Sequence, residues 1–86
     1  MPYVKKIQRV KLDNVVDAMA EAGIKVDGDL NYVLYAFCKR HVDENYNSYK
    51  NFCGELRQCA TEIERRILAK YEDEQIIKNG DIYKSK

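Results

Sequence analysis

The strongest constraint in the sequence is one amphipathic pattern that runs without a break from Asn47 to Asn79. Its apolar residues recur at steps of three and four, so a helix of 3.6 residues per turn places them on one face. The opposite face carries charged side chains that water solvates well. The pattern therefore predicts a single long helix on which the rest of the chain must pack. Its apolar face consists of Phe52, Cys53, Leu56, Cys59, Ala60, Ile63 and Ile67.

Two shorter helices are predicted before the long one. Residues 12–22 have one apolar face, and Gly23 suits the left-handed residue that ends a helix. A second helix is predicted from about Leu30 to Asp43, with Asp29 as its N-cap and with Tyr32 and Tyr35 beside its apolar face. We expect an all-α fold: one three-helix domain over residues 1–86 with a long third helix. The second apolar face consists of Leu30, Val33, Leu34, Phe37, Cys38 and His41.

The two ends of the chain differ from its middle. Residues 1–11 carry four positive charges and no acidic residue. This basic N-terminal segment is either a first helical turn or an arm, and it suits phosphate binding or simple solvation. Asn79 and Gly80 form a C-cap pair, and residues 81–86 are expected to be a tail.

The length of the third helix predicts self-association. About 30 residues at 1.5 Å each give roughly 45 Å, which exceeds the width of a compact domain of this size. Unless the helix breaks near residues 70–74, part of its apolar surface stays uncovered, and a second copy is the simplest cover. We expect a homo-oligomer whose interface contains Ile63, Ile67, Tyr71 and Ile76. Gly54, inside the pattern, is expected to let another helix approach closely.

Composition excludes several classes of protein. The net charge is +1, which does not suggest a nucleic-acid coat or a membrane-surface peptide. No apolar run approaches the roughly 20 residues of a membrane span, and the basic N-terminus lacks the apolar core of a signal peptide. The three cysteines are odd in number and lie within helical patterns, which indicates free thiols in a reducing cytoplasm.

No arrangement of residues predicts catalysis. Cys38, His41, Cys53 and Cys59 form a conceivable zinc set, but no C-x₂-C pair is present, and buried structural thiols are the simpler interpretation. A nucleophilic cysteine would need His41, which falls on an apolar face. The acidic residues of the third helix have no matching carboxylates on the second, so a magnesium site is not favoured. We expect no metal, no cofactor and no enzyme activity.

The most distinctive segments of the chain are Met-Pro-Tyr-Val-Lys at its start, Gly-Asp-Leu-Asn-Tyr over residues 28–32, and Tyr-Glu-Asp-Glu-Gln-Ile with Asn-Gly-Asp-Ile-Tyr over residues 71–83. Together they resemble a family of small tailed-phage and prophage proteins, over nearly the whole length of the chain. The middle of the chain, with Cys38, His41 and Cys53, departs from that family. The resemblance implies an origin and a size class but no activity.

A small phage protein without catalytic residues is expected to act by binding, in the cytoplasm of the infected bacterial host. We expect a counter-defence protein that sequesters a nucleotide immune signal as an oligomer, similar in design to phage cyclic-nucleotide sponges. The seven tyrosines and the basic segment favour this interpretation. An alternative is a protein–protein inhibitor of a host enzyme that uses residues 71–74, and a metal-dependent nucleotide hydrolase is less favoured. Nucleic-acid binding is not expected. The expected ligand-binding residues are Tyr3, Lys5, Lys6, Arg9, Tyr32 and Tyr35.

Overall fold

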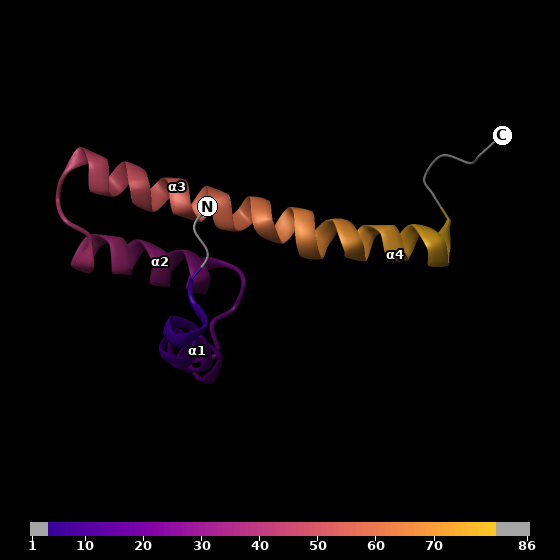
Figure 1. Cartoon of the computed structure of the whole chain (residues 1–86), viewed down its shortest axis with the longest axis horizontal. Coiled ribbons are helices and arrows are strands. Elements are labelled where there is room, and N and C mark those ends of the chain that lie inside the picture. The colour runs from indigo at the N-terminus through magenta and orange to yellow at the C-terminus, as the bar shows by residue number, and fades with distance from the viewer. Residues whose placement is uncertain (1–3, 81–86) are drawn as a thin grey trace. The chain divides into compact units, whose positions relative to one another are not determined.

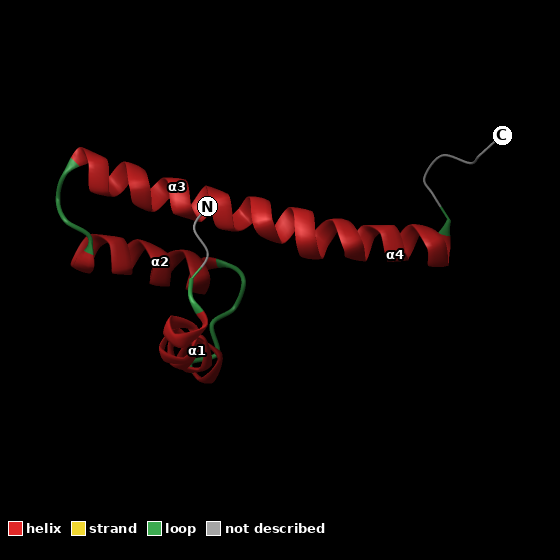
Figure 2. Ribbon diagram, in the orientation of Figure 1, coloured by secondary structure: helices red, strands yellow, loops and turns green. Residues whose placement is uncertain are grey.

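The computed structural model describes residues 4–80, and within this range the chain contains helices and connections but no strand (Figures 1 and 2). Helix α1 comprises Lys6–Glu21 and helix α2 comprises Gly28–His41. The third helix is built from three consecutive segments, α3 (Tyr46–Ile63), η1 (Glu64–Leu68) and α4 (Ala69–Asn79). The predicted all-α fold with a long third helix is therefore confirmed.

The chain divides into two compact units, Met1–Tyr49 and Lys50–Lys86. The first unit contains α1, α2 and the first turn of α3. The second contains the remainder of the long helix, so its described part is a single helix that ends at Asn79.

Helix α1 begins at Lys6, six residues before the predicted start at Leu12. The basic residues between these positions therefore belong to the helix, and Arg9 Nε donates a hydrogen bond to the Val4 carbonyl at 2.8 Å. The C-terminal end is as predicted. Gly23 has φ +71°, and the Ile24 N–H bonds back to the Met19 carbonyl in the six-to-one pattern of a Schellman motif.

The N-cap of α2 is Asp27, so the prediction of Asp29 was wrong by two residues. The Asp27 carboxylate accepts the Asp29 N–H at 3.0 Å, and the Asp29 carboxylate accepts the Lys25 N–H at 3.2 Å. A similar cap starts the long helix, where Asn45 Oδ1 accepts the Ser48 N–H at 2.9 Å. Each cap satisfies an amide that the helix leaves without a partner.

The long helix covers 34 residues without a break, and residues 70–74 are helical. Its one irregularity is the π-helical segment η1, in which hydrogen bonds run from residue i to i+5. Figure 1 shows the ribbon passing continuously from α3 to α4. The sequence pattern did not predict this segment.

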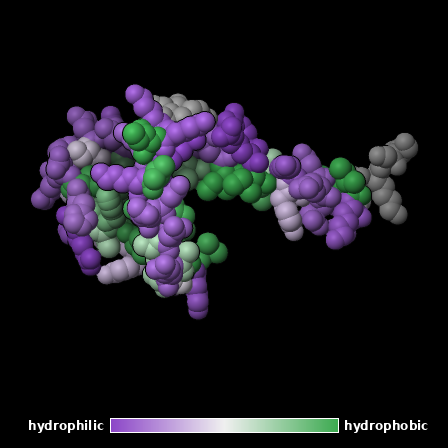
Figure 3. Space-filling model, turned by 60° about the horizontal axis from the view of Figure 1, so that its bottom comes forward, coloured by the Kyte–Doolittle hydropathy of each residue, from purple (hydrophilic) through white to green (hydrophobic). Residues whose placement is uncertain are grey.

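No residue between 4 and 80 is fully buried. Half-buried apolar side chains occur mainly on α2, where Val33, Leu34 and Cys38 are examples. The long helix carries hydrophobic side chains at its surface among hydrophilic ones (Figure 3). Within the described residues, no helix combines the length and the apolar character that a membrane crossing requires.

Candidate functional site

Helix α2 presents two exposed tyrosines next to a positioned arginine. Tyr32 is 61% exposed and Tyr35 is 68% exposed. Arg40 Nη2 donates a hydrogen bond to the Tyr32 hydroxyl at 3.2 Å. Since each α-helical residue advances by about 100°, Tyr32, Tyr35 and Lys39 lie within an arc of about 60°. We call Tyr32, Tyr35, Lys39 and Arg40 the tyrosine–arginine face.

Tyr32 and Lys39 lie across α2 from the centre of its apolar face, whereas Tyr35 and Arg40 lie at the two edges of that face. Leu34 and Cys38 are half-buried, whereas both tyrosines are exposed. The Phe37 and His41 rings, 5.6 Å apart and tilted by 51°, also lie away from the tyrosines on the helical wheel. On the helical wheel Tyr32 lies opposite the apolar face, and Tyr35 lies beside it, about 60° from Cys38. Their aromatic rings are available to a flat ligand.

Arg40 lies in the last turn of α2, where a cation usually offsets the negative end of the helix dipole. Its guanidinium instead reaches back along the helix by two turns to the Tyr32 hydroxyl. A guanidinium has five N–H donors, and this bond occupies one of them. The other donors suit a phosphate, which guanidinium groups bind in a bidentate manner.

The remaining predicted ligand residues lie on or near α1. Lys5 is the N-cap residue of α1, Lys6 is its first residue and Arg9 follows one turn later. Tyr3 lies outside the described residues. The predicted ligand residues between positions 4 and 80 therefore divide between the start of α1 and the middle of α2, both in the first unit.

The π segment changes which side chains share a face of the long helix. In an uninterrupted α-helix, Leu68 and Tyr71 would lie about 140° and 80° from Ile63. A π turn contains one residue more than an α turn, so it shifts the direction of later side chains by about 100°. Leu68 and Tyr71 then lie within about 40° of Ile63, one on each side of it. We call this set of exposed side chains the long-helix face. Its members are Leu56, Ile63, Ile67, Leu68 and Tyr71.

The four predicted interface residues are divided by this geometry. Ile63, Ile67 and Tyr71 belong to the long-helix face and are 47%, 64% and 57% exposed. Ile76 follows the π segment and lies about 120° from Ile63, on a different side of the helix. Leu68 joins the face only because of the π turn.

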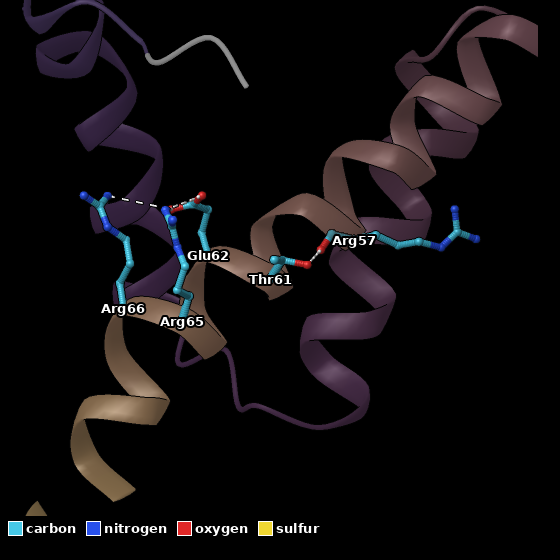
Figure 4. A network of polar contacts seen from close by, with 5 residues as sticks. All are labelled: Arg57, Thr61, Glu62, Arg65 and Arg66. Carbon is cyan, nitrogen blue, oxygen red and sulfur yellow. Dashed lines mark hydrogen bonds and ion pairs between the residues drawn. The ribbon is translucent and has the colours of Figure 1, made fainter. Parts of the chain in front are cut away.

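An ion-pair cluster lies at the start of the π segment (Figure 4). Glu62 accepts from Arg65 Nη2 at 3.1 Å, and Arg66 Nη1 lies 3.8 Å from its other oxygen. The Glu62 side chain is 18% exposed, and both arginines are 64% exposed. The side chain of Arg57 points away from this cluster, while its carbonyl accepts a bond from the Thr61 hydroxyl at 3.0 Å.

Sequence reasoning missed Arg40 and the Glu62 cluster. Glu62 precedes Arg65 and Arg66 by three and four residues, a spacing that indicates ion pairs on a helix. Arg40 follows Tyr32 by eight residues, and only the extended arginine side chain joins them. No comparable sequence signal identifies that pair.

The cysteines carry no arrangement for metal chemistry in the part of the chain that the structure describes. No group of three histidine, cysteine or acidic side chains over residues 4–80 is placed to hold an ion. All three cysteines are free, as expected. Cys38 is half-buried, but Cys53 and Cys59 are exposed, so the expectation of buried thiols was wrong for these two residues within one chain.

Over residues 4–80 the chain is a small helical protein with exposed tyrosines on α2. Comparison with protein families matches residues 1–82 to a domain of unknown function, DUF6899. The match covers nearly the whole sequence, so the chain belongs to this family. Searches of curated proteins and of solved structures found no match.

Proposed function

We propose that the protein is a non-enzymatic phage accessory protein that sequesters a nucleotide signal of bacterial immunity as a homo-oligomer. The observation that carries the proposal is the bond from Arg40 Nη2 to the Tyr32 hydroxyl, beside the exposed Tyr35 ring. This pairing offers the two chemical features that a nucleotide needs, an aromatic surface for the base and a guanidinium for the phosphate.

The two interactions are of useful size. Stacking of a base on an aromatic side chain contributes about 1–3 kcal/mol, and a hydrogen bond to a charged group contributes about 1.5–3 kcal/mol. One stacked base and one hydrogen bond to Arg40 together contribute about 2.5–6 kcal/mol, which is less than the roughly 8 kcal/mol of micromolar affinity, so further contacts in the proposed oligomer would have to supply the rest. Lys39 adds a second positive charge on the same side of α2.

Sequestration follows from what the proposed site contains. Binding of the phosphate by Arg40 and Lys39 stabilises the anion without activating a nucleophile against it. The basic segment Lys5, Lys6 and Arg9 supplies further positive charge to the first unit and would attract the anion over distances of about a Debye length. The proposed outcome is a bound, chemically unchanged nucleotide.

Calorimetry with a panel of cyclic nucleotides and ADP-ribose derivatives tests the proposal. We expect one member of the panel to bind, and Arg40→Met to weaken it about 10-fold to 100-fold, from the value of a charged hydrogen bond. Arg57→Met is the matched control, because it removes an arginine that points away from the ion-pair cluster of the second unit. No heat from any nucleotide, or equal losses in both variants, would contradict the proposed site.

A second candidate function is inhibition of a host enzyme by direct contact. It is supported by the exposure of Tyr71 (57%) and Ile77 (86%) around the acidic residues 72–74. Such a surface would suit a basic patch on a partner protein. A pull-down from bacterial lysate tests it, with Tyr71→Ala as the comparison. One stoichiometric partner that the variant loses would support inhibition. If no such partner is found, nucleotide binding is favoured.

A further inference from the structure

We infer that the π segment aligns the long-helix face so that it binds the same face of a second copy of the chain. This inference rests on the oligomeric part of the proposed function and does not depend on the nucleotide. It names the partner surface and assigns the π turn a role in building it.

The π turn aligns the apolar side chains of the long helix. Without the π turn, Leu68 and Tyr71 would rotate away from Ile63 and Leu56, and the apolar side chains would wind around the helix. With the π turn, all five members of the long-helix face lie within about 40° of one line. A straight apolar line is what two helices require in order to pack along their length.

The long-helix face offers enough area for an interface. Its five side chains are between 38% and 64% exposed, and the described part of the second unit is a single helix, which cannot cover its own face. Half of the surface of five large apolar side chains amounts to roughly 500 Å² per copy. Two copies would bury about 1,000 Å², the lower limit for a specific interface.

The charge of the long helix also permits self-association. Residues 50–79 contain six basic and six acidic residues, so the net charge of this helix is zero. Two copies therefore meet without net repulsion. Acidic and basic side chains also lie next to each other near the centre of the helix, where Glu62 pairs with Arg65 and Arg66.

The test is the molar mass of the full chain in solution, measured by light scattering or sedimentation at micromolar concentration. The unmodified protein should be a dimer or a multiple of one. Leu68→Asp places an unpaired charge in the face and should weaken association at least tenfold. Ile77→Asp is the matched control: Ile77 is 86% exposed and lies about 140° from Ile63, so this variant should stay associated.

A second pair of variants tests the π turn directly. Deletion of Arg65 removes the one residue that the π turn adds. The helix can then be a regular α-helix, and the side chains after the deletion keep their direction relative to Ile63. This variant should remain associated. Insertion of an alanine between Lys70 and Tyr71 rotates Tyr71 by about 100° and should weaken association.

The outcomes separate the inference from its alternatives. A monomer for the unmodified protein, or equal dissociation by Leu68→Asp and Ile77→Asp, would overturn it. Circular dichroism checks that each variant keeps its helix content, and Leu68→Ala provides a milder change if the aspartate variant unfolds. A monomeric variant that still binds nucleotide would leave the proposed ligand site intact, whereas an assembled protein that binds none would refute the ligand alone.

Discussion

Substitution of Gly54 by alanine should stabilise the protein. Gly54 lies eight residues inside the long helix, where glycine costs about 1 kcal/mol relative to alanine because of its greater freedom in the unfolded chain. Its φ is not positive, and a Cβ built on it meets no heavy atom within 4 Å, so among the described residues no helix makes the close approach expected at Gly54. On the helical wheel Gly54 lies about 180° from Ile63, opposite the long-helix face. The full helix-propensity gain of about 1 kcal/mol is therefore expected.

Thermal unfolding followed by circular dichroism measures this gain, at one fixed protein concentration because association shifts the midpoint. For a domain of this size, 1 kcal/mol corresponds to a rise in Tm of about 4–8 °C. Gly23→Ala is the matched control: its φ of +71° is unfavourable for alanine, so the same substitution should lower stability by about 1 kcal/mol. A lower Tm for Gly54→Ala would mean that another helix contacts Gly54, and it would refute the assignment of the association face.

Two further predictions concern the long helix. Asn45→Ala removes the side chain that accepts the Ser48 N–H, and it should lower the free energy of unfolding by about 1 kcal/mol in urea denaturation. An unchanged value would show that the cap contributes nothing in solution. Glu62→Gln removes the ion pairs with Arg65 and Arg66 and should cost at most about 1 kcal/mol, because both arginines are largely exposed. This loss should shrink at high salt, and a loss independent of salt would argue against an electrostatic origin.

The helices could be predicted from the sequence because their signal is periodic and extends over many residues. The apolar repeat from Phe52 to Ile67 indicated the long helix, and Gly23 indicated the end of α1. The start of α1 was left open, because Ile7 and Val10 continue the apolar spacing of a helix but the basic residues around them suit an arm equally well. The choice between Asp27 and Asp29 as the N-cap of α2 is decided by the conformation of one turn, and the sequence pattern does not predict that conformation.

The candidate site was predictable only in part. Tyr32 and Tyr35 were selected from the tyrosine excess of the chain, and the structure leaves both exposed, but the contact of Arg40 with Tyr32 depends on the conformation of one side chain. The π segment depends on a small difference between two hydrogen-bond patterns over five residues. Sequence periodicity assumes a constant turn per residue, so it could not place Leu68 on the same face as Ile63.

Sequestration is tested directly by the mass balance of a nucleotide that binds. The protein is mixed with that nucleotide, the free fraction is measured after filtration, and the total is measured again by chromatography after heat denaturation. Sequestration predicts that the free nucleotide falls in proportion to the protein added and that all of it returns unchanged after denaturation. At the same protein concentration, the Arg40→Met variant should leave more of the nucleotide free. Recovery of a hydrolysed product, or a free fraction that the protein does not lower, would contradict the account.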